Sequence, residues 1–294
     1  MTPVITLSVD SWNPSCTPED QDLATRALEA GGVLFMPDLV FALQDDERDF
    51  LSPDTAGEGK NVSFDGARNR LSGSSADAAS QRRLQAMLAR YAVASRSLLQ
   101  GLLPHYAPTL QQARTSFRPV EIAGRDISWR KDDTRLHVDS FPSSPTGGDR
   151  ILRVFSNVNP NGQSRAWRLG ESFEAVSRRF LPQIRGPLPG ANQVLKAVGV
   201  TKRLRSDYDH FMLGLHDRMK ADLAYQANAD QSDVGFPPGS SWIVYTDQVS
   251  HAAMGGQHAF EQTFHLPVAG MFDPAQAPLG VLERLVGRTL VWNR

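Results

Sequence analysis

Apolar positions recur at helical spacing in the first third of the chain. Residues 77–101 place apolar side chains about every three to four positions, which predicts a long helix, and Asp77 fits its N-cap. A shorter helix is predicted at 21–30, followed by a buried strand at 33–36. Between these helices, residues 45–75 are polar and rich in glycine, a pattern typical of loops.

The pattern changes to strands in the middle of the chain. Residues from about 115 to 160 are strand-like, and the apolar run 150–158 is the strongest strand signal of the sequence. A tight turn at 159–162 leads to another predicted strand at 165–170. Weaker strand signals lie at 121–123 and 128–139.

Helical and strand patterns alternate once more toward the end. The patterns at 173–180, 194–198 and 207–228 predict helices, the last strongly. Strands return at 240–246 and 259–266, and a final helix is expected at 280–289.

This order predicts a mainly β protein with flanking helices. Strands that form two facing antiparallel sheets, with helices before and between them, fit a double-stranded β-helix, the jelly-roll core of cupin-like proteins. We expect one domain over 1–294. Residues 1–115 would give N-terminal helical and mixed support, 116–170 and 236–270 the jelly-roll core, and 171–235 a helical insertion.

The composition and net charge argue against several classes of function. With 294 residues, 40% hydrophobic and 21% charged, the chain can bury a full core. A net charge of −1 gives no reason to expect nucleic-acid binding. The single cysteine, Cys16, excludes an internal disulfide and thiolate zinc sites. No run reaches the roughly 18 apolar residues of a membrane span, and no signal peptide is evident, so a cytoplasmic protein is expected.

The candidate chemistry begins with His137 and Asp139. Two residues apart on an extended segment, they point to the same side of the backbone. Such a pair with a distant histidine makes the facial triad of non-haem Fe(II) oxygenases. The pair by itself is a weak signal, because a surface histidine beside a turn-forming aspartate gives the same pattern.

The third ligand has three candidates, His251, His258 and His265. We predict His251, because it follows a strand and precedes a Gly-Gly turn, which places it near a barrel mouth. His258 starts the last strand and is assigned to substrate binding instead. His210 and His216 are interpreted as ordinary helix residues.

Oxygenases of this type usually take 2-oxoglutarate, whose far carboxylate needs a buried cation. Arg153 lies inside an apolar strand, where a charge is costly unless paired, so we predict that it anchors this carboxylate; a solvent-facing arginine is the alternative. Neutral hydrogen bonds to the co-substrate are predicted from four further residues: Asn157, Asn159, Gln262 and Thr263.

Basic residues cluster just before the metal pair. They are Arg125, Arg130, Lys131 and Arg135. They form either a solvated face, balanced by neighbouring aspartates, or a rim that receives an anionic substrate.

With these residues in view, the chain resembles the Kdo hydroxylase family, where Kdo is the 3-deoxy octulosonic acid of the lipopolysaccharide inner core. The resemblance lies in 129–143, 152–160, 167–173 and 245–254, and is most specific in the string Arg-Leu-His-Val-Asp-Ser-Phe-Pro at 135–142. The first ~110 residues add little to it.

The resemblance implies an Fe(II)/2-oxoglutarate dioxygenase of Gram-negative bacteria that uses O2, with ascorbate as a possible stimulant. It implies hydroxylation at C3 of a Kdo residue on a Kdo-lipid A precursor, giving Ko. His137, Asp139 and His251 would match the metal positions, Arg153 the co-substrate anchor, and the residues near 125–135 the sugar carboxylate and lipid phosphates. Peripheral contact with the cytoplasmic face of the inner membrane is compatible with such a substrate. The sequence leaves the oligomeric state open.

Two other functions remain open at this point. One is a 2-oxoglutarate hydroxylase of an amino-acid or protein side chain. The other is a non-oxidative protein, either a metal-dependent cupin-type sugar isomerase, which would consume no O2, or a sugar-binding protein, which would not need His137, Asp139 and His251 together.

Overall fold

The structure is a computed structural model, which describes residues 2–124, 127–187 and 204–291. The helices are α1 (Pro18–Glu29), α2 (Ala78–Leu102), α3 (Phe173–Phe180), α5 (Asp207–Ala221), α6 (Leu223–Asn228) and α7 (Pro278–Val286). The strands are β1 (Val4–Thr6), β2 (Val33–Met36), β3 (Val62–Asp65), β4 (Arg70–Ser72), β5 (Gln111–Arg118), β6 (Arg150–Asn157), β7 (Arg165–Leu169), β8 (Ser232–Phe236), β9 (Ser241–Tyr245), β10 (His251–Gly255) and β11 (Ala259–Leu266). Short 3₁₀ turns lie at Asp45–Phe50, Pro53–Thr55, Gly66–Arg68, Pro104–Tyr106, Trp129–Lys131, Leu181–Gln183, Val268–Gly270 and Pro274–Gln276.

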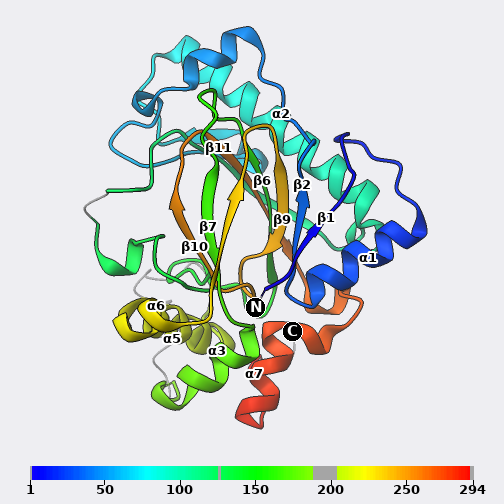
Figure 1. The fold of residues 1–294 in the computed structure, drawn as a ribbon, viewed down its shortest axis with the longest axis vertical. Coiled ribbons are helices and arrows are strands. Elements are labelled where there is room, and N and C mark those ends of the chain that lie inside the picture. Colours follow the sequence, from blue (N-terminus) through cyan, green and yellow to red (C-terminus); the bar gives the residue numbers. More distant parts are fainter. Residues whose placement is uncertain (1, 125–126, 188–203, 292–294) are drawn as a thin grey trace.

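Two facing sheets form the core (Figure 1). The larger has the strand order β1-β2-β9-β6-β11-β5-β3-β4, and the smaller has the order β10-β7-β8. All pairings are antiparallel except β1 with β2. This is the predicted jelly-roll core. The N-terminal third adds strands to both edges of its larger sheet, so the core and its support share one sheet.

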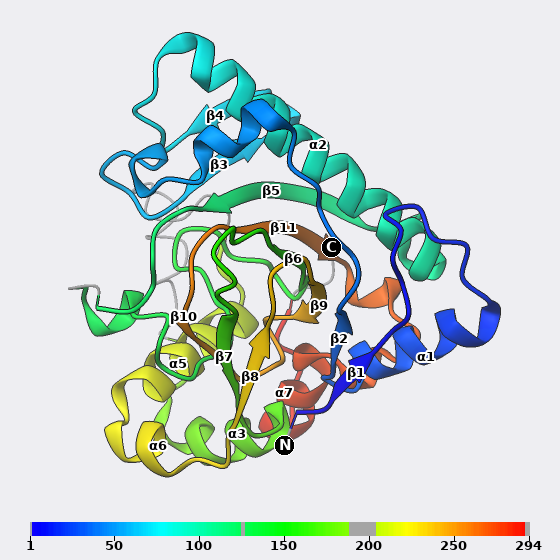
Figure 2. The same cartoon turned by 45° about the horizontal axis from the view of Figure 1, so that its top comes forward.

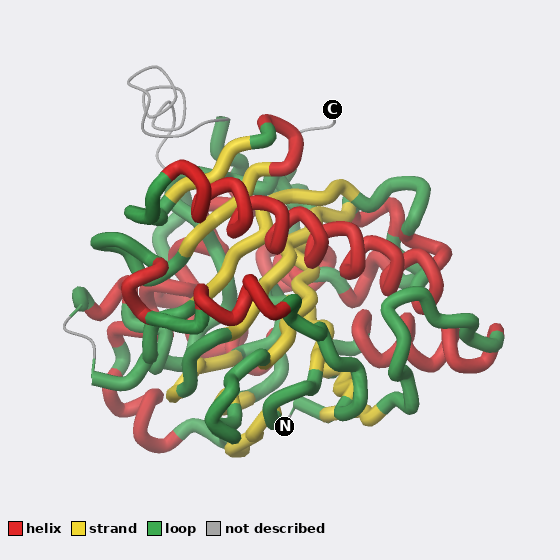
Figure 3. Tube along the Cα trace, turned by 90° about the horizontal axis from the view of Figure 1, so that it is seen from above, coloured by secondary structure: helices red, strands yellow, loops and turns green. Residues whose placement is uncertain are grey.

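Helices α1 and α2 cover the outer face of the larger sheet. Figure 2 shows α2 running along the back of β5 and β11, and Figure 3 shows it lying across the strands. Leu98, Leu99 and Leu102 of α2 pack in one buried cluster with Leu152 and Val154 of β6. Because side chains alternate along a strand, the intervening β6 residues face the space between the sheets.

The helices of the insertion and α7 close one end of the barrel. Residues of α3, α5 and α7 form a buried cluster with Leu136 and Val138 and with Ala252 of β10. Leu136 and Val138 alternate with His137 and Asp139. The apolar side chains therefore dock this segment against the helices while the polar ones point the other way.

The structure corrects several local predictions. Residues 121–123 lie in a loop and 129–131 form a 3₁₀ turn. The segment 135–139 is not a strand, and only His137 in it makes an isolated bridge. The stretch 45–75, predicted as loop, contains the hairpin β3–β4. These short segments pair through tertiary contacts, which local periodicity does not report.

Two predicted helices also differ. The helix predicted at 207–228 is two helices, because Asp222 leaves the helical conformation at the end of α5 and caps α6 with its side chain. The helix predicted at 194–198 lies outside the described residues. The description "mainly β" fits the core alone, since helices hold more of the described residues than strands do. None of the described helices is long and apolar enough to cross a membrane.

A buried ion pair fixes the loop that supports the metal-ligand segment. Arg150, at the start of β6, is fully buried and its Nε lies 2.8 Å from the Asp247 carboxylate. It also donates to Gln248 at 2.6 Å. The backbone N–H of Asp139 donates to the carbonyl of Thr246, the neighbour of Asp247, at 2.8 Å. The ion pair therefore fixes the loop to which the backbone of Asp139 is hydrogen-bonded.

We predict that Arg150→Met lowers the free energy of unfolding by about 3–5 kcal/mol, because Asp247 is left buried without a counter-charge. Urea unfolding at neutral pH measures the change. The double substitution Arg150→Met with Asp247→Asn recovers much of it, since no charge then remains buried. A double variant as unstable as the single one would contradict the ion-pair explanation.

Candidate metal centre and co-substrate cavity

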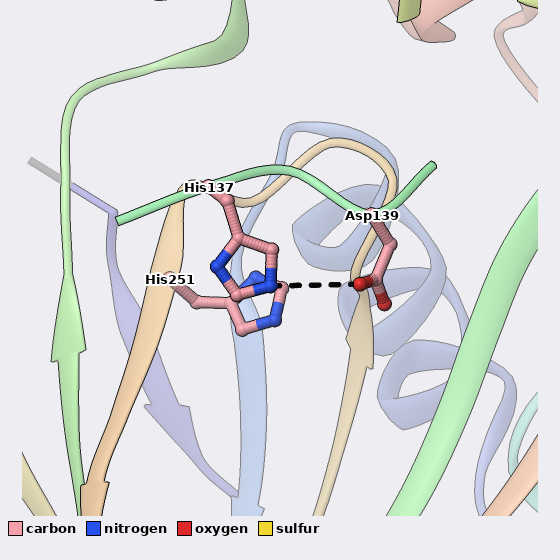
Figure 4. A group of neighbouring side chains, drawn as sticks. All are labelled: His137, Asp139 and His251. Carbon is pink, nitrogen blue, oxygen red and sulfur yellow. Dashed lines mark ion pairs between the residues drawn. The ribbon is translucent and has the colours of Figure 1, made fainter. Parts of the chain in front are cut away.

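His137 and His251 lie side by side through a backbone bridge. The N–H of His137 donates to the carbonyl of His251 at 3.0 Å, and the N–H of His251 donates back at 2.9 Å. Their ring centroids are 4.6 Å apart, and Asp139 faces them from the same segment as His137 (Figure 4). One ligand atom from each of His137, Asp139 and His251 lies within 4.8 Å of the others. The structure thus brings together the three residues predicted from sequence.

Both imidazoles are oriented in the same way. Nδ1 of His137 lies 2.7 Å from the carbonyl oxygen of Arg135, and Nδ1 of His251 lies 2.8 Å from that of Val249. A carbonyl only accepts, so each Nδ1 carries the proton and each Nε2 keeps a lone pair for a metal. In both cases the acceptor is two residues before the histidine.

Asp139 is held ionised. Arg153 lies 3.1 Å from its Oδ2, and its Oδ1 lies 3.7 Å from Nε2 of His137. Burial opposes ionisation, but the charge of Arg153 and the contacts with His137 and His251 outweigh it and hold the pKa of Asp139 well below its usual range. Two neutral imidazoles and one carboxylate are the donors that ferrous iron takes in a facial triad.

A cavity of about 40 Å³ extends from the three ligands into the barrel. Its other lining residues are Arg118, Asp133, Arg153, Phe155, Arg165, Trp167, Ala253 and Glu261. Several of its polar atoms are buried and have no hydrogen-bond partner among the described residues: Nε of Arg118, Oδ2 of Asp139, Nε of Arg153 and Nε1 of Trp167. Unmet donors from two arginines and an indole fit an anionic ligand beside the metal.

Arg153 is where the prediction placed it, inside the barrel. Besides Asp139 it contacts Glu261, with 3.4 Å between Nη1 and Oε1, and Glu261 also pairs with Arg118. These two arginines lower the pKa of Glu261 against the effect of its burial. The alternative of a solvent-facing Arg153 is wrong, since the residue is 8% exposed.

The structure places three of the neutral co-substrate candidates elsewhere. The amide of Asn157 donates to the carbonyls of Gln163 and Phe236, and the side-chain oxygen of Asn159 accepts from the backbone of its own turn. The amide of Gln262 faces β5, where its oxygen accepts from Thr115 at 2.6 Å. Each side chain saturates backbone or cross-strand groups, and none lines the cavity, so we remove them from the site.

Thr263 and His258 do not line the cavity either. The Thr263 hydroxyl lies 3.4 Å from Glu261, behind that carboxylate. His258 has a φ of 61° in the turn between β10 and β11, a conformation rare outside glycine. His251 is the first residue of β10, and the turn that holds His258 follows the last one. The predicted contact of His258 with substrate is therefore not supported.

The basic cluster divides into paired and exposed residues. Arg130 pairs with Asp217 of α5 at 3.1 Å, and Arg135 pairs with Asp132 at 3.1 Å. Lys131 is exposed, and Arg125 lies outside the described residues. Arg130 and Arg135 are thus paired with aspartates, as in the first interpretation, and they also join the metal-ligand segment to α5. Contact of this cluster with an anionic substrate stays a prediction.

Six residues near the metal ligands were not predicted from sequence. They are Arg118, Arg165, Trp167, Glu261, His216 and Lys220. Trp167 stacks on the imidazole of His251 at 5.2 Å between centroids, and His216 lies 5.5 Å from His137. A charged residue at an inward strand position, as at 118, 165 and 261, is the signal that could have found half of them.

The jelly-roll fold and the buried His-Asp-His site with its arginine-lined cavity define a non-haem Fe(II)/2-oxoglutarate-dependent dioxygenase. The model of one protein family matches residues 11–289, and its description is 3-deoxy-D-manno-oct-2-ulosonic acid (Kdo) hydroxylase. The chain belongs to this Kdo hydroxylase family. None of the curated proteins with which the chain was compared matches it.

Solved structures agree with the family model. The chain is similar to the Kdo hydroxylase KdoO in complex with alphaketoglutarate and Fe(III), with 49% identity and a TM-score of 0.96 over 99% of this chain and 98% of that one. It is similar to the same enzyme with cobalt(II), with 49% identity and a TM-score of 0.97 over 100% and 99%. An apo structure gives 50% identity and a TM-score of 0.96 over 99% and 98%. The likeness thus covers the whole chain, including the N-terminal third.

The buried histidines predict how stability depends on pH. Burial, with a contribution from His137, lowers the pKa of His251 to about 4, and burial lowers that of His137 as well. Between pH about 6.5 and 4 the unfolded chain therefore binds more protons than the folded one, so acid destabilises the metal-free protein. His251 alone accounts for a loss of about 1 kcal/mol by pH 5.5. Urea unfolding of metal-free protein at pH 7 and 5.5 measures this, and a His251→Gln variant with an unreduced pH dependence would contradict it.

Proposed function

We propose that this enzyme hydroxylates C3 of a Kdo residue on a Kdo-lipid A precursor and gives Ko, with 2-oxoglutarate and O2 as co-substrates. The observation that carries the proposal is the convergence of His137, Asp139 and His251 at one end of an arginine-lined cavity, in a chain of the Kdo hydroxylase family. Family membership also decides against the side-chain hydroxylase and the non-oxidative cupin as alternatives.

His137, Asp139 and His251 would hold the iron. Bound Fe(II) supplies the redox chemistry that couples oxidative decarboxylation of 2-oxoglutarate to hydroxylation of the substrate. The chain's own contribution is to keep both Nε2 atoms unprotonated, to keep Asp139 ionised, and to surround the centre with buried groups that exclude water.

The co-substrate would lie against the arginines of the barrel. Arg153 reaches it from β6, Arg118 from β5 and Arg165 from β7. Arg153 is favoured over Arg118 for the far carboxylate, because both have an unpaired Nε but of the two only Arg153 also contacts the metal ligand Asp139. The same guanidinium would then tie the co-substrate to a metal ligand.

A lipid-anchored substrate requires the enzyme to work at a membrane surface. Peripheral contact with the cytoplasmic face of the inner membrane therefore stays part of the proposal, as does stimulation by ascorbate. Phe141, 39% exposed with its ring 5.5 Å from the Arg153 guanidinium, places an apolar side chain beside the site.

We predict that Kdo-lipid A in detergent micelles stimulates succinate release from 2-oxoglutarate, and that Asp139→Ala abolishes both the release and Fe(II) binding. Loss of the carboxylate removes one of three ligands and leaves Arg153 with Glu261 as its remaining ion-pair partner. Succinate is measured directly, and iron binding is followed anaerobically through the visible absorption of the Fe(II)·2-oxoglutarate complex. Succinate release stimulated by a peptide but not by the glycolipid would refute the assignment of substrate.

We predict that Arg153→Lys raises the KM for 2-oxoglutarate by about tenfold, because lysine keeps the charge beside Asp139 but loses the planar two-nitrogen fork. Steady-state succinate release at varied 2-oxoglutarate measures it. Arg168→Lys, on β7 but paired outside the barrel with Asp233, is the matched control and should leave the KM unchanged. An unchanged KM in Arg153→Lys would move the anchor to Arg118 or Arg165.

A further inference from the structure

Hydroxylation at C3 brings the carboxylate of the substrate sugar close to the metal. In Kdo the C1 carboxylate is attached to C2, the direct neighbour of C3. When C3 is at the metal, that carboxylate is only two bonds away, in a site from which water is largely excluded. An anion there needs a cation close to the metal ligands.

Two polar residues of α5 lie on the face of the insertion that meets the metal centre. His216 and Lys220 are four residues apart, so they share one side of the helix. The His216 ring lies edge-on to His137, with 5.5 Å between centroids and an interplanar angle of 86°. The charge of Lys220 contributes to the lowered pKa of His137, and the charges of Asp133 and Asp139 act on Lys220 in turn.

Lys220 is buried with too few partners for its charge. Only 1% of the residue is exposed, and its ammonium donates one hydrogen bond, to the carbonyl of Arg130 at 3.1 Å. Among residues 2–124, 127–187 and 204–291, no carboxylate lies within 4.0 Å of it. Asp133 is already paired with Lys60 at 2.5 Å. An ammonium has three donors, and burying it without an anion is costly.

We propose that Lys220 binds the C1 carboxylate of the substrate sugar and that His216 accepts a hydrogen bond from one of its hydroxyls, an inference that rests on the proposed function. Nδ1 of His216 lies 3.0 Å from the acceptor-only carboxylate of Asp217, so its Nε2 is available as an acceptor. The helical insertion then supplies substrate recognition, while the two sheets supply the metal and co-substrate site. The buried ammonium of Lys220 destabilises the protein without substrate, and the carboxylate of the bound sugar would compensate for this cost.

The test compares two changes that remove the same interaction, one on each partner. Lys220→Gln keeps a donor for the Arg130 carbonyl but has no charge. The methyl ester of the Kdo carboxylates, on the same lipid A, removes the charge from the substrate. Substrate-stimulated succinate release is measured for both proteins with both substrates, together with the slow release without substrate.

For the wild-type enzyme, esterification should lower kcat/KM by roughly ten- to a hundredfold, as expected for a lost charge-assisted hydrogen bond. Lys220→Gln should lose a similar factor with the acid, and should no longer distinguish acid from ester. Succinate release without substrate is the internal control: if Lys220→Gln lowers it by the same factor, Lys220 acts on the metal site and the proposal is wrong. Arg218→Gln, an exposed charge on the same helix, is the matched control and should behave as wild type.

Stability separates this proposal from a purely structural role for Lys220. Removal of a buried, underpaired charge should leave the melting temperature of Lys220→Met equal to or above that of wild type. A variant that melts lower and discriminates acid from ester as wild type does would overturn the proposal. If the wild-type enzyme shows no stimulation by Kdo-lipid A, the proposed function itself fails, before any variant is considered.

Discussion

The backbone bridge between His137 and His251 is the interaction on which the site depends. Two reciprocal hydrogen bonds, at 3.0 and 2.9 Å, join a segment of the loop before β6 to the first residue of β10. Residues 114 positions apart in sequence thereby present their imidazoles side by side. Because the bridge is made by main-chain atoms, it sets the spacing of the two histidines whatever their side chains do, and the Nδ1 contacts then fix the ring orientation.

Charge burial organises the rest of the barrel interior. Asp139, Arg153, Glu261 and Arg118 form a chain of contacts from the metal ligands across the larger sheet. Each member would be costly to bury alone, and each is compensated by a neighbour. Through these contacts Arg153 links the metal ligand Asp139 to Glu261 and Arg118 in the barrel interior.

The strands and the inserted helices contribute different residues around the metal centre. Strands β5, β6, β7, β10 and β11 contribute lining residues to the cavity beside the metal ligands, and helices α1 and α2 pack against the outer face of the larger sheet. The inserted helices pack against the segment 136–138 and bring His216 and Lys220 to the metal side. In the proposed arrangement the barrel binds iron and the co-substrate, and the inserted helices recognise the sugar acid.

Local sequence patterns were enough to predict the long elements and to point to the three metal ligands. Periodicity is a local property, so α2, β6, β9 and β11 could be predicted from it, and the spacing of His137 and Asp139 gave two ligands on one face. The resemblance to the Kdo hydroxylases rested on motifs that span the same residues. Strands β3 and β4, with four and three residues, carry too few positions for a periodic signal. Strands β8 and β10 are as long as β9, but their sequences SDVGF and HAAMG lack its run of large apolar residues.

Which polar residues share the cavity depends on how the sheets and helices pack. Asn157 and Gln262 lie in strands and Asn159 in the turn after β6, and their side chains bind backbone and cross-strand groups. Arg118, Trp167 and Glu261 instead line the cavity from strands far apart in sequence. His216 and Lys220 have the pattern of ordinary helix residues until α5 is docked on the metal-ligand segment. Local sequence sets the face on which a side chain lies, but the packing of sheets and helices decides what that face meets.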